Sequence, residues 1–127
     1  MREILFRGKR MDNGEWVEGF LTFDGVNEDY YIYDREVDPS TVGQYTGLKD
    51  KNGKRIFEGD IIKDDWGKTY EVFFTTKSCS FMAKLEHAPN EWEKGNYRLG
   101  DAWCSTICVI GNIHDNPELM DGKENNE

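Results

Sequence analysis

The feature that most constrains this fold is an alternation of apolar and polar residues with a period of two, broken at short intervals by turn sequences. This period is typical of β-strands, because successive side chains of a strand point to opposite faces of its sheet. Asn13-Gly14 and Asn52-Gly53 stand between such segments, and Asn-Gly readily adopts the positive φ angles of a tight hairpin turn. The chain is therefore predicted to be mainly β, with little helix.

The same pattern predicts the individual elements. Residues 79–86 also fit a short helix, but the shortness of the segment and its neighbouring strands favour a strand. Residues 107–110 are apolar on both faces, which predicts a central strand. Residues 87–100 are predicted to be irregular, and Asn116-Pro117 is predicted to begin one short helical turn. The predicted strands are 4–6, 16–23, 30–33, 41–46, 56–57, 60–63, 69–75, 79–86 and 107–113.

A chain of 127 residues usually forms one domain. We expect this domain to span residues 1–117 and an acidic, flexible tail to follow at 118–127. Gly59-Asp60-Ile61-Ile62 is similar to the strand entry of many small SH3-like barrels, in which a glycine makes the bend. The predicted architecture is a small SH3-like barrel or a strongly bent antiparallel sheet over 42–75. A second sheet portion is predicted to end in the strand at 107–113.

The charge limits the choice of partner. Sixteen Lys/Arg and 25 Asp/Glu give a net charge of −9, which disfavours binding to nucleic-acid phosphates unless basic residues cluster. Two interrupted basic clusters exist, at residues 7–10 and 49–55. An alternative function is therefore a nucleic-acid-associated protein that binds through a basic hairpin face or mimics DNA with its acidic groups. The basic residues of such a face are Arg7, Lys9, Arg10, Lys49, Lys51, Lys54 and Arg55.

Residues that could carry catalysis are few. Cys79, Cys104 and Cys108 are odd in number and have neither a disulfide pattern nor the spacing of a zinc site. His87 and His114 have no evident partner, and no common nucleophile or phosphate-binding motif occurs. We therefore expect reduced cysteines and no catalytic residues, metal or cofactor. The chain has no apolar run of about 18 residues that could span a membrane and no signal peptide, so we expect a cytoplasmic protein.

Three segments of the chain resemble the YopX family of phage and prophage proteins. The first comprises residues 2–10 with 13–17, the second 42–50 through Asn52-Gly53 to 58–61, and the third 109–119. They occur in order from Arg2 to Leu119, and the middle segment is the most specific. No matching motif is found within the region 64–105, which we expect to be variable. The resemblance implies a β-rich fold and a bacterial cytoplasmic setting, and it brings no established activity or catalytic residues.

The leading functional hypothesis is a non-enzymatic phage or prophage accessory protein that contacts a phage or host protein. Gln44-Tyr45-Thr46 and Glu58-Gly59-Asp60 suggest a polar, aromatic contact surface, but they also suit a hairpin that defines the fold. Both interpretations stay open. A third hypothesis is a hydrolase or transferase that uses His87 or His114. Exposed strand edges also favour a homo-oligomer. The candidate partner-binding residues are Gln44, Tyr45, Thr46, Lys49, Lys51, Arg55, Glu58 and Asp60.

Overall fold

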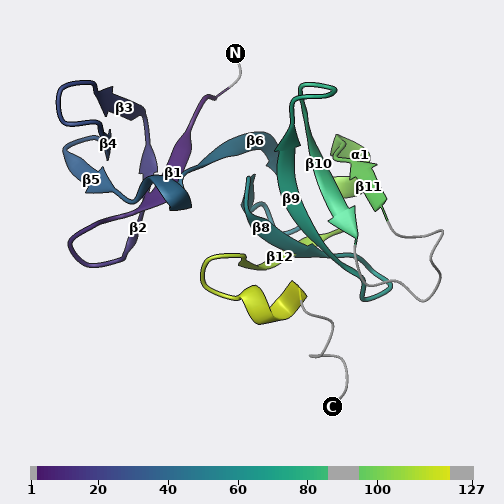
Figure 1. Ribbon diagram of the computed structural model, residues 1–127. Coiled ribbons are helices and arrows are strands. Elements are labelled where there is room, and N and C mark those ends of the chain that lie inside the picture. The colour runs from purple at the N-terminus through teal and green to yellow at the C-terminus, as the bar shows by residue number, and fades with distance from the viewer. Residues whose placement is uncertain (1–2, 86–94, 121–127) are drawn as a thin grey trace. The chain divides into compact units, whose positions relative to one another are not determined.

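The computed structural model describes residues 3–85 and 95–120 and confirms a mainly β chain (Figure 1). About half of the described residues lie in strands, which form three antiparallel sheets, and the one α-helix among them is α1 (Asp101–Cys104). The chain divides into two compact units, Met1–Gly47 and Leu48–Glu127. The boundary falls inside β6 (Gly43–Lys49), where Gly47 has a φ of +91°. The sequence analysis does not predict this division.

Unit 1 contains β1 (Phe6–Lys9), β2 (Trp16–Gly19), β3 (Leu21–Asp24), β4 (Asp29–Ile32), β5 (Arg35–Val37), the 3-10 turn η1 (Pro39–Thr41) and the start of β6. β1 pairs antiparallel with β2 through the predicted turn, in which Gly14 has a φ of +75°. The predicted strand 16–23 is instead two strands, because pairing is interrupted at Phe20. β3 to β5 form a three-stranded sheet, and Ile32 and Val37 are its buried residues.

Unit 2 contains the end of β6, then β7 (Arg55–Phe57), β8 (Asp60–Lys63), β9 (Thr69–Thr75), β10 (Ser80–Leu85), β11 (Gly95–Arg98), α1, β12 (Cys108–Asn112) and the 3-10 turn η3 (Pro117–Met120). A five-stranded sheet has the order β11-β10-β9-β8-β12. β10 confirms the strand predicted at 79–86, and η3 confirms the helical turn after Asn116. β11 lies in the segment predicted to be irregular, of which residues 87–94 fall outside the described residues. Residues 121–127 of the expected acidic tail also fall outside them.

The strand order of unit 2 corrects two predictions. β11 and β12 are the two edges of the sheet, so among the described residues no barrel closes and the SH3-like barrel is not confirmed. The prediction of a central strand at 107–113 is wrong, because β12 is an edge strand of this sheet, paired with β8 among the described strands. The loop after β6 covers the other edge: the Lys51 amide donates to the Ile107 carbonyl at 2.9 Å, and the Val109 amide donates to Asp50 Oδ2 at 2.9 Å. Ile107 is thereby buried without a second neighbouring strand, whereas Ile110 stays 36% exposed.

The core of unit 2 lies between this sheet, β7 and α1. Its buried residues include Ile56, Ile62 and Val72, none of which is exposed at all. Burying each such side chain stabilises the fold by about 1.5–3 kcal/mol. The ring of Tyr70 contacts those of Trp103 and Tyr97 edge-on, at centroid distances of 5.0 and 5.8 Å. The remaining core members are Tyr70, Ala83, Leu85, Leu99, Cys104 and Ile107.

Candidate functional site

The eight predicted partner-binding residues divide between the two units. Gln44, Tyr45 and Thr46 lie in β6 within unit 1, and the other five belong to unit 2. Tyr45 is 5% exposed and Asp60 is 1% exposed. The Tyr45 amide donates to the Leu5 carbonyl at 2.8 Å, and Asp60 Oδ2 accepts the Phe57 amide at 2.7 Å. Burial of both side chains, together with the amide that the Asp60 carboxylate accepts, gives Tyr45 and Asp60 structural roles. The residues with accessible side chains are Gln44, Thr46, Lys49, Lys51, Arg55 and Glu58.

The turns 50–54 and 64–68 share one sequence pattern, Asp-x-x-Gly-Lys, and one geometry. In each turn Oδ1 of the aspartate accepts the amides two and four residues further on, all at 2.9 Å. The glycines, Gly53 and Gly67, have φ values of +80° and +85°, which L-residues with side chains rarely adopt. We call these segments the paired turns. The predicted hairpin at 49–54 is confirmed, and the structure adds its counterpart at 64–68.

The second carboxylate oxygen joins each turn to the rest of unit 2. Asp50 Oδ2 accepts the Val109 amide, and Asp64 Oδ2 accepts the Tyr70 hydroxyl at 2.8 Å. Burial raises the pKa of Asp50, but the amides of Val109, Lys54 and Asn52 lower it more, so the net pKa lies below 3.8. Asp50 is therefore ionised at neutral pH. Lys51 Nζ lies 4.0 Å from Asp65 Oδ1, which brings the two turns next to each other.

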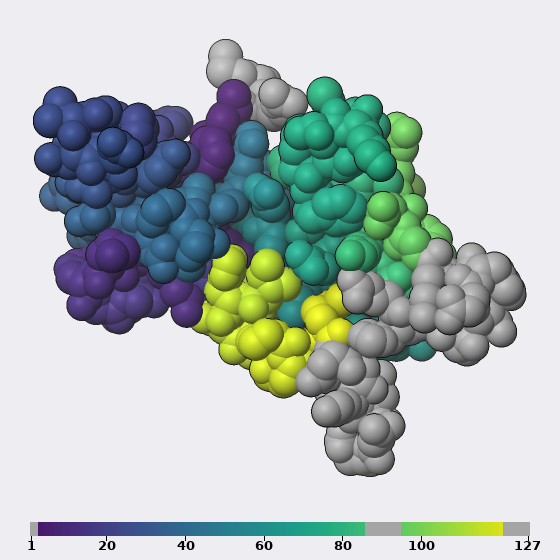
Figure 2. Space-filling model, in the orientation of Figure 1, coloured from purple at the N-terminus to yellow at the C-terminus, as the bar shows by residue number. Residues whose placement is uncertain are grey.

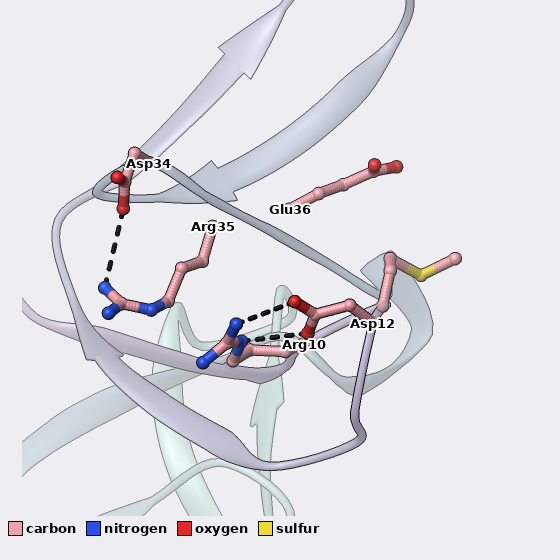
Figure 3. Close-up of a pocket in the computed structure, with 6 residues that line it drawn as sticks. Arg10, Asp12, Asp34, Arg35 and Glu36 are labelled. Atoms are coloured by element: carbon pink, nitrogen blue, oxygen red, sulfur yellow. Dashed lines mark hydrogen bonds and ion pairs between the residues drawn. The ribbon is translucent and has the colours of Figure 1, made fainter.

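Unit 1 contains a polar pocket of about 410 Å³ (Figure 3). It lies between the β1–β2 turn and the turn that joins β4 to β5. The Met11 amide donates to the Glu36 carbonyl at 2.9 Å, and an isolated bridge joins Arg10 to Val37, so the backbone holds the two turns together. The pocket is lined by Arg10, Met11, Asp12, Asp34, Arg35 and Glu36.

Both arginines of the pocket are paired with aspartates. Arg10 Nε and Nη2 donate to Asp12 Oδ1 and Oδ2 at 2.9 and 2.7 Å, and Arg35 Nη1 donates to Asp34 at 3.5 Å. The first pair lowers the pKa of Asp12, chiefly through the hydrogen bond from Arg10, and raises the pKa of Arg10. Figure 3 shows Glu36 extending away from both pairs. A guanidinium has five donors, so each arginine keeps donors for a ligand beyond its aspartate.

Large apolar side chains are exposed around the pocket and on the adjoining three-stranded sheet, dark blue in Figure 2. Met11 is 57% exposed and Tyr33, next to Asp34, is 62% exposed. Tyr33 has a φ of +59°, and its ring lies so close to Gly19 that a Cβ there would be 2.4 Å from it. Phe20 and Val26 are 66% and 90% exposed. Sequence reasoning missed this site because β5 has three residues and only one of them, Val37, is buried, too little to produce an alternating pattern.

Among the described residues, those considered for catalysis or metal binding form no common site. All three cysteines are free; Cys79 is exposed, and burial raises the pKa of Cys104 to about 11. The amide of His114 donates to Asn112 Oδ1 at 2.9 Å, and His87 lies outside the described residues. Within residues 3–85 and 95–120, no three His, Cys, Asp or Glu side chains are placed to hold a metal ion. In the same ranges no helix has the length and apolar character to cross a membrane.

Fold and surface together define a mainly β protein of two units with a polar, arginine-containing pocket in the first. The chain belongs to the YopX family, since the family model described as YopX protein matches residues 5–121. This match confirms the resemblance seen in the three segments of the sequence. The crystal structure of protein EF1440 from Enterococcus faecalis is similar, with a TM-score of 0.62 and 25% identity, over 95% of this chain and 100% of that chain. No curated protein matches the chain.

Proposed function

We propose that this chain is a non-enzymatic accessory protein of a phage or prophage, which acts in the bacterial cytoplasm by binding a protein partner through unit 1. The observation that supports the proposal is the pocket of unit 1, with exposed Met11 and Tyr33 beside Arg10 and Arg35. Met, Tyr and Arg are enriched in protein interfaces. Tyr and Arg are also frequent among the residues that contribute most to binding energy. Membership of the YopX family supports the phage or prophage setting.

The charge of unit 1 favours a partner with a basic contact surface. Residues 1–47 contain five Lys/Arg and ten Asp/Glu, so this unit has a net charge of −5. The partner is therefore a phage or host protein whose basic side chains face the acidic groups around the pocket, while its carbonyl or carboxylate oxygens accept from the two arginines. Complementary charge of this kind increases the association rate and selects among partners.

The test uses a double variant, Met11→Ser/Arg35→Gln, with the matched control Ile110→Ser/Arg98→Gln. The control likewise replaces one apolar side chain with serine and one arginine with glutamine, at exposed positions of unit 2. The full chain is immobilised, proteins captured from a bacterial host lysate are identified by mass spectrometry, and the affinity of a purified captured protein is measured by calorimetry. Met11→Ser/Arg35→Gln is expected to weaken binding about tenfold or more, as loss of two central interface residues does. The control should bind like the wild type.

Two outcomes would contradict the proposal. One is a captured protein that binds the Met11→Ser/Arg35→Gln variant as tightly as the wild type. The other is a lysate from which the wild type captures nothing that the Met11→Ser/Arg35→Gln variant does not. Thermal unfolding of both variants serves as a check on folding, and exposed substitutions usually change stability by no more than about 0.5 kcal/mol.

A further inference from the structure

The paired turns of unit 2 bring several lysines together although they are separate in the sequence. Lys51 and Lys54 belong to the first turn, Lys68 ends the second, and Lys63 is the last residue of β8. The 4.0 Å contact between Lys51 Nζ and Asp65 Oδ1 joins the turns directly. Cys108, the first residue of β12, pairs with Lys63 on one edge. On the opposite side of the start of β12, the amide of Lys51 donates to the carbonyl of Ile107. All these residues therefore converge at the start of β12.

Two of the three acidic residues of the paired turns, Asp50 and Asp64, face inward, and most of the lysines face outward. Asp50 and Asp64 are 5% and 9% exposed, and their oxygens accept backbone amides and the Tyr70 hydroxyl. Lys51, Lys54 and Lys63 are exposed. Asp65 is an exposed acid of these turns, and its contact with Lys51 joins two side chains that are 60% and 46% exposed. Exposed ion pairs of this kind are weak, so a phosphate can replace Asp65 as the partner of Lys51.

Trp66, at the tip of the second turn, is 82% exposed. Its indole is a large flat surface in water, beside the lysines. Bases of single-stranded nucleic acids stack on such exposed aromatic rings, while neighbouring lysines bind the phosphates. The bases of a duplex are already stacked on one another, and the net charge of −9 opposes the long series of phosphate contacts that duplex binding needs.

We propose that the paired turns form a binding site for a short stretch of single-stranded nucleic acid, with Trp66 stacked on a base and Lys51, Lys54 and Lys63 bound to phosphates. This site is independent of the protein-binding surface proposed for unit 1. It adds Trp66 and Lys63 to the basic hairpin of residues 49–55 seen in the sequence.

The affinity of the full chain for a fluorescently labelled 12-nucleotide oligo-dT is measured by anisotropy at 50 mM and 150 mM NaCl. Neutralising three phosphates on a single strand gives a slope of log affinity against log salt of about −2, so threefold more salt weakens binding about tenfold. Trp66→Ser should weaken binding about tenfold through lost stacking. Lys51→Gln/Lys54→Gln should reduce the salt slope to about −0.7.

Matched controls separate this site from a general charge effect. Lys77→Gln/Lys84→Gln removes the same charge from exposed positions of the same unit, and Phe20→Ser removes an exposed aromatic ring from unit 1. Both control variants should bind oligo-dT like the wild type. The proposal is overturned if the wild type does not bind at 50 mM NaCl, or if the control variants lose as much affinity as the test variants. Equal binding of a 12-base-pair duplex or of a polyglutamate peptide would also overturn it.

Discussion

Replacing Asp50 with alanine is expected to destabilise unit 2 by about 3 kcal/mol. The Asp50 carboxylate is 5% exposed and accepts three backbone amides, those of Asn52, Lys54 and Val109. Two of these bonds close the turn, and the third joins the turn to β12, 59 residues away in the sequence. One side chain thus holds both the hairpin and the outer edge of the five-stranded sheet.

The magnitude follows from the fate of each amide after the substitution. The Val109 amide is partly buried beneath the turn, and a buried donor without an acceptor costs about 1–3 kcal/mol. The Asn52 and Lys54 amides belong to an exposed turn where water can replace the carboxylate, so each loses only a net contribution of about 0.5–1.5 kcal/mol. The three contributions sum to about 2–6 kcal/mol, a range that includes the expected loss of about 3 kcal/mol. With a urea slope of about 1.5 kcal/mol per molar, the midpoint of unfolding should fall by about 2 M.

Equilibrium unfolding in urea at pH 7 measures this change, with Asp65→Ala as the control. Asp65 carries the same carboxylate, but it is exposed and forms a surface ion pair with Lys51, so its removal should cost less than about 0.5 kcal/mol. A midpoint for Asp50→Ala no lower than that of Asp65→Ala would refute the assignment of Asp50 as the anchor between the turn and β12.

The pKa of Asp50 gives this contribution a defined dependence on pH. Its pKa in the folded state lies below the ordinary 3.8, the net result of burial, which raises it, and of three amides and the Lys54 charge, which lower it more. The ionised carboxylate therefore stabilises the fold above about pH 4, and this stabilisation is lost as the pH falls through the folded-state pKa. The difference in unfolding free energy between wild type and Asp50→Asn should therefore shrink as the pH falls from about 5 to about 2. A gap that stays constant across that range would contradict the lowered pKa.

Three further predictions test other contacts. Gly111→Ala should destabilise the chain by about 1–3 kcal/mol in urea unfolding, because a Cβ there would lie 2.5 Å from Asn116 Oδ1. That oxygen accepts the Asn112 amide, so it is held in place. An unchanged midpoint of unfolding would show that Asn116 moves at no cost. Asp60→Ala should lower thermal stability, because the Phe57 amide loses its buried acceptor, yet leave capture of the unit 1 partner intact. In native protein at pH 8, a thiol reagent should modify Cys79 quickly and Cys104 only after unfolding, since burial raises the pKa of Cys104 to about 11; rapid labelling that survives Cys79→Ser/Cys108→Ser would contradict this.

Turn chemistry and alternation made most of unit 2 predictable. Asn52-Gly53 and Glu58-Gly59 mark bends that the structure places there, with φ values of +80° and +94° at the two glycines. The predicted strand 69–75 coincides with β9. These predictions succeed because each rests on a local requirement: glycine for a positive φ, or alternating residues for a strand with one buried face.

The errors come from contacts between residues far apart in the chain. The apolar run of residues 107–110 indicates burial on both sides, which a second neighbouring strand normally provides. Here Asp50 and the turn after β6 lie on that side instead, and Ile110 stays 36% exposed. The pocket of unit 1 was missed for a similar reason. Its two halves, near Arg10 and Arg35, meet through backbone bonds to Glu36 and Val37 that no local pattern encodes.

The paired turns explain how an acidic chain can present a basic surface. Together the two Asp-x-x-Gly-Lys turns contain three acids, Asp50, Asp64 and Asp65, and three bases, Lys51, Lys54 and Lys68, so they leave the net charge unchanged. The turn geometry then separates acid from base: the aspartate that begins the turn points inward because its oxygens accept the amides two and four residues on, while Lys51 and Lys54 remain in solvent. The net charge of −9 therefore argues against extended phosphate binding by the whole chain, but it does not describe the local surface at Trp66. A site of three lysines and one indole needs only a few nucleotides, and a short single strand supplies both the phosphates and the unstacked bases.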